Sequence, residues 1–193
     1  INVTPQKTVF VMKKGNSRFD ITTGLVGKHQ VGPVALAAAL ADKFGLNKKQ
    51  IEEGAAKTIP FEHRMQPRLL GGAWIIDDTY NGNIEGIRAG LELLNDLKAR
   101  RKVYVTPGLV DQGGESQRVH NEIGQLIAQA NPDEVVLMKN SVTNWIEEGL
   151  KKDGFRGKLK IENDPLNFYS NLEHMVAAGD VLLMQNDWTD NYN

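Results

Sequence analysis

The sequence contains no cysteine, so disulfide bonds and thiolate metal sites are excluded. It also has no apolar run approaching the ~18 residues of a membrane span, and no basic segment followed by an apolar stretch at its start. We therefore expect a protein that is neither exported nor embedded in a membrane. The lack of cysteine is typical of a reducing compartment, so a cytoplasmic location is expected.

An excess of charge of either sign is missing as well. The 23 basic and 24 acidic residues leave a formal net charge of -1. Such a chain has no long-range attraction for nucleic acid or for anionic lipid, so any polyanionic ligand must be bound by a local group of side chains. We expect neither nucleic acid nor a membrane as a partner.

What is present is typical of a globular protein. Hydrophobic residues make up 40% of the chain and charged residues 24%, and 193 residues are enough to bury a core. The length favours one domain with a smaller appended unit. The chain opens without a methionine and moves directly into a strand-like pattern, so we expect it to be the later part of a longer protein.

The first sixty residues predict two strands followed by two helices. Two β-rich runs are separated by polar turn formers, which indicates a hairpin. An alanine-rich segment ended by Gly45 predicts a helix, and Asn47 is a good N-cap for a second one. The strands are expected at residues 7–12 and 18–23, and the helices at residues 32–44 and 47–57.

Beyond residue 60 the pattern alternates between short apolar runs typical of strands and segments with apolar residues three or four apart, typical of helices. Each connection is long enough for a crossover between parallel strands. The sequence therefore predicts an α/β fold, a Rossmann-like and mostly parallel sheet with helices on both faces. The expected strands are residues 73–76, 103–105, 135–137, 159–161 and 181–184, separated by four helices, the last at about residues 165–178.

The loops after these strands carry most of the candidate ligand groups. In a parallel sheet such loops meet at one edge, where helices begin and their amide groups point outward. We expect one rim to collect the polar loops at residues 77–81, 107–111, 139–141, 163–164 and 185–188. A single polar loop is explained equally well by helix capping. The string DDTYNGN at residues 77–83 exceeds what a cap needs, so a binding site is favoured there.

Two patterns resemble known binding loops but fail at a decisive position. Residues 77–88 have oxygen ligands at alternate positions, as in a calcium loop, yet the twelfth is Arg88 where a glutamate is required. Residues 24–29 resemble the end of a phosphate-binding loop, but Thr22 replaces the leading glycine and His29 the magnesium-holding Ser or Thr. We therefore expect no metal ligand in this chain and, if the protein uses ATP, a phosphate loop upstream of Ile1.

Four segments occur in an order that resembles the Mur ligase family, and the similarity covers nearly the whole chain. They are GKHQVGPVALAAALA at residues 27–41, Glu-His-Arg at residues 62–64, DDTYNGN at residues 77–83, and Asp-Gln-Gly at residues 111–113 with Ser116 and His120 downstream. Within the family, Thr79, Tyr80 and Asn81 favour the branch that adds the dipeptide D-alanyl-D-alanine, because sister ligases usually read more like Asp-Tyr-Ala-His there.

The resemblance implies a division of the chain and a reaction. Residues 1–62 would be the end of the central ATP-binding domain, and residues 63–193 the final, glutamate-ligase-type Rossmann-like domain. In the family, ATP converts the carboxylate of a UDP-MurNAc-peptide to an acyl phosphate, which the amine of D-Ala-D-Ala attacks. The implied cofactors are ATP and Mg²⁺, bound mainly by upstream sequence. We expect a monomer, and no ligase activity from this chain alone.

The resemblance also implies roles for individual residues. Arg64 would reach the ATP phosphates from the hinge, and Asp78 would contact the ribose or organise the nucleotide site, both as catalytic residues. The further cofactor contacts implied are His29, Gln30, His63, Tyr80, Asn81 and Asn83. The substrate contacts implied are Asp111, Ser116, His120, Asn186 and Asp187.

The chain departs from the family pattern in several places, one of them Pro-Gly-Leu at residues 107–109 where the family has Gly-Asp-Met, and alternatives stay open. Gln30 and Pro33 stand where the family has two asparagines near adenine, and the family's Lys-Gly-Ser-Arg near the end is Gln-Asn-Asp-Trp at residues 185–188. The alternatives are a folylpolyglutamate synthetase, a Mur ligase for another amino acid, and a non-catalytic Rossmann-like binding module. The string DDTYNGN argues against the first two, whereas Gln30 and Pro33 are compatible with the third.

Overall fold

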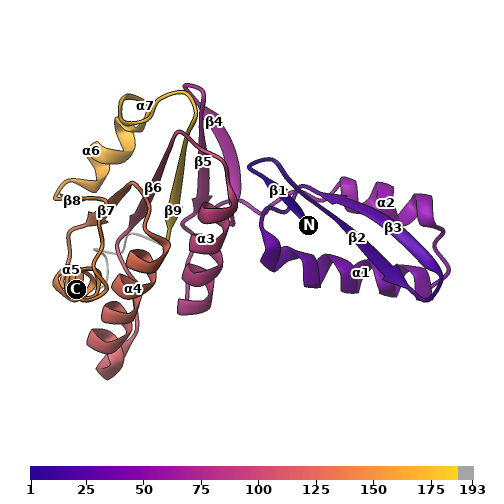
Figure 1. The fold of residues 1–193 in the computed structure, drawn as a ribbon, viewed down its shortest axis with the longest axis horizontal. Helices are drawn as coiled ribbons and strands as arrows, with labels where there is room; N and C mark the ends of the chain where they lie inside the picture. The colour runs from indigo at the N-terminus through magenta and orange to yellow at the C-terminus, as the bar shows by residue number, and fades with distance from the viewer. Residues whose placement is uncertain (187–193) are drawn as a thin grey trace.

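A computed structural model of the chain describes residues 1–186, which form two bodies joined by a short linker (Figure 1). The smaller body contains an antiparallel sheet with the strand order β1-β2-β3, followed by a 3-10 turn and two helices. Its elements are β1 (Asn2–Thr4), β2 (Lys7–Lys14), β3 (Ser17–Thr23), η1 (Lys28–Gln30), α1 (Val31–Lys43) and α2 (Lys48–Ala56).

Side chains from one face of this sheet form the core of the smaller body. Phe10, Phe19 and Ile21 are buried there against Val34 of α1 and Ile51 of α2. The start of α2 is fixed by a capping box, since the Asn47 side chain accepts from the amide of Gln50 at 3.0 Å and the Gln50 side chain accepts from the amide of Asn47 at 2.9 Å. The expected hairpin and both expected helices are therefore present.

The larger body is built on a six-stranded sheet with the order β4-β5-β9-β6-β7-β8. Five of its strands are parallel to one another, and β4 pairs antiparallel to β5 at the edge. The strands are β4 (Gln66–Leu70), β5 (Ala73–Asp78), β6 (Arg101–Thr106), β7 (Glu134–Met138), β8 (Lys158–Glu162) and β9 (Asp180–Gln185). The helices are α3 (Ile84–Asp96), α4 (Ser116–Ala130), α5 (Thr143–Lys152), α6 (Pro165–Ser170) and α7 (Leu172–Met175), with a 3-10 turn η2 (Gly113–Glu115) before α4.

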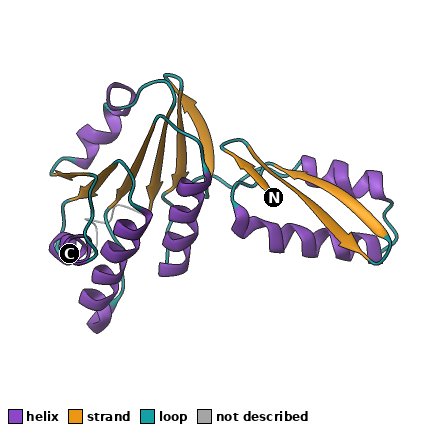
Figure 2. Ribbon diagram, viewed as in Figure 1, coloured by secondary structure: helices purple, strands orange, loops and turns teal. Residues whose placement is uncertain are grey.

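Helices cover both faces of the large sheet (Figure 2). On one face, α3, α4 and α5 bury side chains such as Leu91, Ile123 and Ile146 against the strands. On the other, Phe168 of α6 and Leu172 of α7 form a separate apolar cluster with strand residues. Burial of apolar area on both faces explains why the strands read as nearly continuous apolar runs. The predicted α/β class, a Rossmann-like and mostly parallel sheet preceded by a small β-β-α-α unit, is confirmed.

Three features were not expected from the sequence. Strands β1 and β4 were missed, and β4 is short and contains Pro67, which an edge strand tolerates because one side of it needs no ladder hydrogen bonds. The helix expected at about residues 165–178 is wrong in its length. It is split into α6 and α7 at Asn171, whose side-chain amide donates to the carbonyl of Asn167 at 2.9 Å and so competes with continued helix.

The two bodies touch through few residues. Val26, just before η1, is buried in the same apolar cluster as Met65 and Ile87 of the larger body. Lys28 Nζ lies 2.6 Å from Asp96 Oδ1 at the end of α3. The boundary at residues 62/63 falls within the linker between α2 and β4 and stays a prediction.

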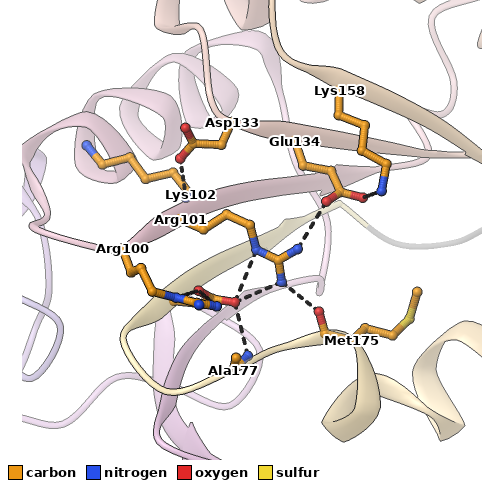
Figure 3. Close-up of polar contacts among 9 residues, drawn as sticks. Arg100, Arg101, Lys102, Asp133, Glu134, Lys158, Met175 and Ala177 are labelled. Atoms are coloured by element: carbon orange, nitrogen blue, oxygen red, sulfur yellow. Dashed lines mark hydrogen bonds and ion pairs between the residues drawn. The ribbon is translucent and has the colours of Figure 1, made fainter.

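The parallel strands give the larger body two distinct edges. At the edge where β6 and β9 begin, a buried ion network joins four strands and the turn before β9 (Figure 3). Asp180 is fully buried there and receives the guanidinium groups of Arg100 and Arg101, while Arg101 also reaches Glu134 at 3.2 Å. The opposite edge, where the strands end, is free to carry a binding site. None of the helices formed by residues 1–186 has both the length and the apolarity needed to traverse a bilayer.

Candidate functional site

A cleft of about 510 Å³ lies where the η1 turn of the smaller body faces the end of β5 and the start of α3. It brings together seven residues to which the sequence assigned cofactor, catalytic or substrate contacts. They are His29, Gln30, Arg64, Asp78, Asn81, Asn83 and Asn186. The remaining lining comes from Met65, Gly82, Gly86 and Ala89.

The carboxylate of Asp78 lies at the floor of this cleft and is held from two sides. Its Oδ1 accepts the backbone N–H of Met65 at 3.1 Å, and its Oδ2 accepts the side-chain amide of Gln185 at 2.9 Å. Burial raises the pKa of Asp78, and the two hydrogen bonds together with the charge of Arg64 oppose that rise. The carboxylate still has lone pairs for a ligand, because each oxygen accepts only one of these bonds.

Arg64 supplies the only guanidinium group among the residues that line the cleft. Its two terminal nitrogens donate to the backbone oxygen of Asn81 at 2.9 Å and to its side-chain oxygen at 2.7 Å. The guanidinium carbon also lies 4.7 Å from the centre of the Tyr80 ring. Arg64 is thus exposed and held at the rim by its own loop, and an anion in the cleft would have to compete with Asn81 for it.

The linker that carries Arg64 has an unusual backbone. His63 and Met65, on either side of Arg64, have φ angles of 57° and 45°. This left-handed backbone conformation is unfavourable for residues other than glycine. Two contacts of His63 with the β5–α3 region stabilise this backbone conformation of the linker. The imidazole Nδ1 of His63 lies 3.0 Å from Asp77 Oδ2, and its carbonyl accepts the N–H of Tyr80 at 3.2 Å. His63 therefore ties the linker to the β5–α3 loop and does not line the cleft itself.

Asn83 and Asn186 line the cleft and also make hydrogen bonds that stabilise the backbone around it. The Asn83 side chain caps α3 by accepting the N–H of Gly86 at 2.8 Å. Asn186 is buried with a φ of 70°, and its side-chain amide donates to Thr106 at 3.2 Å. A Cβ on Gly82 would collide with the Asn186 side-chain oxygen, so glycine is required between them.

The other predicted substrate contacts gather around the next loop instead of the cleft. His120 is fully buried, with Nδ1 2.6 Å from the carbonyl of Ser116 and Nε2 accepting the N–H of Leu109 at 3.0 Å. Both contacts are satisfied by one neutral tautomer, and burial lowers the pKa of His120. His120 thus stabilises the conformation of the β6–α4 loop by bonding to the backbone near both of its ends. Asp111 is exposed on that loop with a φ of 59°.

Some predictions fall outside what the cleft brings together. Tyr80 is 56% exposed, and its ring contacts the Arg64 guanidinium but does not line the cleft. Asp187 lies outside the described residues. Two further hollows, between α3 and α4 and beside Arg100, are of similar volume, about 530 and 580 Å³, but contain none of the predicted residues. Within residues 1–186, no group of three or more His, Asp or Glu side chains is placed to hold a metal ion.

Sequence reasoning missed the residues that position the cleft from below. Gln185, Tyr104 and Asp77 are buried and make polar contacts around Asp78 or the linker, yet the sequence assigned no individual role to any of them. The signal available for Gln185 was its place directly after four apolar residues of the last strand, at the edge where ligands bind. For Tyr104, buried in a strand, the sequence offers no signal that separates it from a core aromatic.

The chain is similar in sequence to proteins of a known family. The family described as Mur ligase, glutamate ligase domain, matches residues 63–185. A protein named UDP-N-acetylmuramoyl-tripeptide--D-alanyl-D-alanine ligase from Mycobacterium leprae is 30% identical over 184 residues, covering 86% of this chain and 35% of that protein. The Escherichia coli protein of the same name is 28% identical over 137 residues, covering 70% of this chain and 30% of its own. The chain therefore spans about a third of the length of these relatives.

Solved structures show the same fold. MurF from Acinetobacter baumannii superposes with a TM-score of 0.77 at 19% identity, over 99% of this chain and 41% of that one. MurF ligase from Thermotoga maritima in complex with ADP gives a TM-score of 0.75 at 21% identity, over 94% of this chain and 40% of that one. Folylpolyglutamate synthase from the same organism gives 0.64 at 17% identity, over 94% and 42% of the two chains.

The family resemblance seen in the sequence motifs is confirmed by these matches. The matched residues 63–185 make up well over half of the 193, and they include the linker, the DDTYNGN loop and the strand that ends at Gln185. The Mycobacterium leprae relative aligns over 86% of the chain, a larger share than the residues matched by the family model. This chain belongs to the Mur ligase family.

Proposed function

We propose that this chain is the carboxyl-terminal part of an ATP-dependent amide ligase that adds D-Ala-D-Ala to a UDP-MurNAc-peptide in the synthesis of peptidoglycan precursors. The observation that carries the proposal is the cleft in which Arg64 and Asp78 of the larger body face His29 and Gln30 of the smaller one. A nucleotide held there would contact both bodies at once, so its binding would set their relative position.

The two charged residues of the cleft suit different parts of ATP. A carboxylate accepts two hydroxyl hydrogen bonds, so Asp78 is suited to the ribose. The guanidinium of Arg64 can neutralise charge on the phosphates as an acyl phosphate forms and breaks down. Because Asn81 and Tyr80 hold Arg64 at the rim, we infer that it exchanges these partners for phosphate oxygens when the two bodies close on the nucleotide.

Adenine would lie towards the smaller body. The side-chain amide of Gln30 can donate and accept hydrogen bonds, as the asparagine in the family pattern does, and His29 is exposed beside it. Pro33 has no polar side chain and sits in the first turn of α1, so it supplies shape and no base contact. We propose that Gln30 carries the base recognition that the family divides between two asparagines.

The phosphates and Mg²⁺ would depend on residues beyond this chain. Arg64 is one cation against the several charges of a triphosphate, and residues 1–186 hold no cluster of metal ligands. Mg²⁺ would supply charge neutralisation at the phosphates when bound. We therefore propose that the 193-residue chain alone has no ligase activity. The lack of cysteine favours a cytoplasmic location for the complete enzyme, which we expect to act as a monomer.

The dipeptide acceptor is proposed from the loop and the relatives. Thr79, Tyr80 and Asn81 follow the pattern of the dipeptide-adding branch, and the two relatives described above carry the name of that ligase. The proposed acceptor contacts are Asp111, Ser116, Asn186 and Asp187. His120 would act on the acceptor only through the loop that it holds.

Nucleotide binding is tested on the 193-residue chain by titrating ADP with Mg²⁺ and following amide chemical shifts. We expect shifts at the cleft, and an affinity about ten-fold to a hundred-fold lower for Arg64→Ala, because a hydrogen bond to a charged group contributes about 1.5–3 kcal/mol. Arg68→Ala is the matched control, since Arg68 is exposed on β4 and does not line the cleft. An unchanged affinity in Arg64→Ala would remove Arg64 from the phosphate site.

The ligase assay uses the complete protein that contains this chain. ATP-dependent phosphate release should require both the UDP-MurNAc-peptide and D-Ala-D-Ala, and Asp78→Asn should reduce it. Release that instead follows a single added amino acid, or glutamate with a folate, would assign the protein to another branch of the superfamily. No release with any acceptor, together with no ADP binding, would favour a non-catalytic binding module.

A further inference from the structure

The side chain of Gln185 is buried beneath the cleft and has a partner for each hydrogen-bonding group. Its amide nitrogen donates to Asp78 Oδ2 at 2.9 Å and to the carbonyl of Gly86 at 3.0 Å, while its amide oxygen accepts from the Tyr104 hydroxyl at 3.1 Å. Gln185 itself is 1% exposed. Gln185 therefore joins β9 to Tyr104 on β6, to Asp78 at the end of β5 and to the first turn of α3.

Only one orientation of this amide satisfies its surroundings. A carboxylate and a backbone carbonyl can only accept, so the nitrogen must face Asp78 and Gly86 and donate both of its hydrogens there. The oxygen then faces Tyr104, whose hydroxyl donates to it and makes the reverse orientation unfavourable. Burial raises the pKa of Tyr104 far above its usual value, so the hydroxyl keeps its proton at every physiological pH.

We propose that Gln185 is a positioning residue for the carboxylate of Asp78, and that Tyr104 locks it in the donating orientation. The sheet register supports this, because Gln185 and Asp78 are direct partners on the neighbouring strands β9 and β5. Gly90 of α3 leaves the space for the amide, since a Cβ there would collide with it. A shorter or apolar side chain at residue 185 would leave Asp78 without its buried donor.

The hydrogen bond from Gln185 affects both the ionisation of Asp78 and the orientation of its carboxylate. Asp78 is partly buried, and no cation is bonded to it among the described residues, so the donated amide hydrogen and the Met65 N–H stabilise its ionised form directly, with the charge of Arg64 acting from further away. With both oxygens held, the remaining lone pairs point in fixed directions toward the cleft. The role in nucleotide binding rests on the proposed function, whereas the hold on the carboxylate can be measured without any nucleotide.

The first test measures the ionisation of Asp78 in the 193-residue chain by ¹³C NMR of its side-chain carboxyl. In Gln185→Met we expect the titration midpoint to rise by about one pH unit or more relative to the unaltered chain, because one charge-assisted hydrogen bond is lost. Tyr104→Phe, which removes only the hydroxyl, should raise it less. An unchanged midpoint in Gln185→Met would overturn the proposal.

Two control variants separate positioning from general loss of stability. Asp180→Asn weakens the same strand at its other end, roughly 16 Å away along β9, without touching Asp78. It should lower the unfolding temperature and leave the Asp78 midpoint unchanged. Gln117→Met repeats the substitution at an exposed site on α4 and should change neither. If Asp180→Asn moved the Asp78 midpoint as far as Gln185→Met does, Gln185 would have no specific role.

The second test uses the pH dependence of ADP binding. Gln185→Glu keeps the shape but places a second carboxyl against Asp78 and the Gly86 carbonyl, which only a protonated carboxyl can contact favourably. ADP affinity should therefore approach that of the unaltered chain at low pH and fall about ten-fold or more toward pH 8. Equal affinity at every pH would overturn the proposal. If the unaltered chain bound no ADP but Gln185→Met still shifted Asp78, the positioning role would be supported and the proposed nucleotide site would fail.

Discussion

The buried ion network at the amino-terminal edge of the large sheet gives the sharpest stability prediction. Asp180 has no exposed surface, and its carboxylate accepts from Arg100 at 3.0 and 3.1 Å, from Arg101 at 2.8 and 3.1 Å, and from the backbone N–H of Ala177 at 3.0 Å. The perturbation is Asp180→Asn. It keeps the volume but removes the charge and turns one amide N–H₂ toward groups that can only donate.

The expected loss of stability is about 3 kcal/mol. Removing one partner of a buried ion pair costs about 3–5 kcal/mol, because the other charges remain without compensation. The lower end applies here since the Arg100 side chain is 62% exposed and can turn to water, whereas Arg101 is 32% exposed and also bonded to Glu134. A loss of this size corresponds to a decrease of about 6–12 °C in the unfolding temperature.

The stability contributed by the Asp180 carboxylate should decrease at low pH. Burial alone would raise the pKa of Asp180, but the Ala177 N–H and the two guanidinium groups outweigh it and hold the pKa below its usual value. A carboxyl with a lowered pKa in the folded state contributes stability that is complete above the unfolded value of about 3.9 and is lost as the pH falls through the folded one. The difference between the unaltered chain and Asp180→Asn should therefore shrink below about pH 4.

The assay is urea unfolding followed by tryptophan fluorescence. All three tryptophans, residues 74, 145 and 188, belong to the part of the sequence after the linker, so their emission reports on that part. Arg118→Ala is the control, because the Arg118 pairs with Glu115 of η2 and Glu122 of α4 lie at the surface and their loss should leave the midpoint unchanged. A loss below about 1 kcal/mol in Asp180→Asn would refute the assignment of this network as a main stabilising contact.

Two further predictions concern the loops at the opposite edge. Burial lowers the pKa of His120, so the unfolded chain takes up a proton below about pH 6.5 before the folded one does, and the free energy of unfolding should fall by at most about 1.4 kcal/mol per pH unit there. His120→Gln should lack this decrease in urea titrations at pH 7.5 and 5.5, and an equal decrease would contradict it. Gly82→Ala should destabilise by about 1–3 kcal/mol through collision with Asn186, and Asn186→Gly in the same chain should recover part of that loss. Additive effects in that double-mutant cycle would show that the two residues do not compete for the same space.

Most of the fold could be predicted because the sequence repeats one local signal. Four of the five parallel strands contain apolar runs, β8 alternates between charged and apolar residues, and the helices between the strands have apolar residues on one side. These patterns do not depend on distant residues. The strand β4 could not be predicted in this way. Its five residues QPRLL contain Pro67 and show no alternation, and they form a strand only because β5 offers a free edge.

The candidate site was predictable only in part. The string DDTYNGN identified the loop, because its polar residues exceed what a helix cap needs, and Asp78, Asn81 and Asn83 do line one cleft. Which of two adjacent carboxylates faces the cleft was settled by the alternation of the strand, since Asp77 points to the linker and holds His63. The orientation of Asp78 depends on Gln185, which is 107 residues away in sequence and adjacent only in the sheet.

Local patterns in the sequence specify the order of strands and helices apart from β1, β4 and the break between α6 and α7, and they also carry the family motifs, because each of these lies in contiguous residues. The tertiary structure alone decided the strand order β4-β5-β9-β6-β7-β8, in which the last strand enters between two earlier ones. That insertion places Gln185 against Asp78 and Tyr104, and it buries Asp180 between two arginines. The physical reason is that hydrogen-bonded pairing between strands joins residues far apart along the chain, and no local pattern of side chains records which strand will lie beside which.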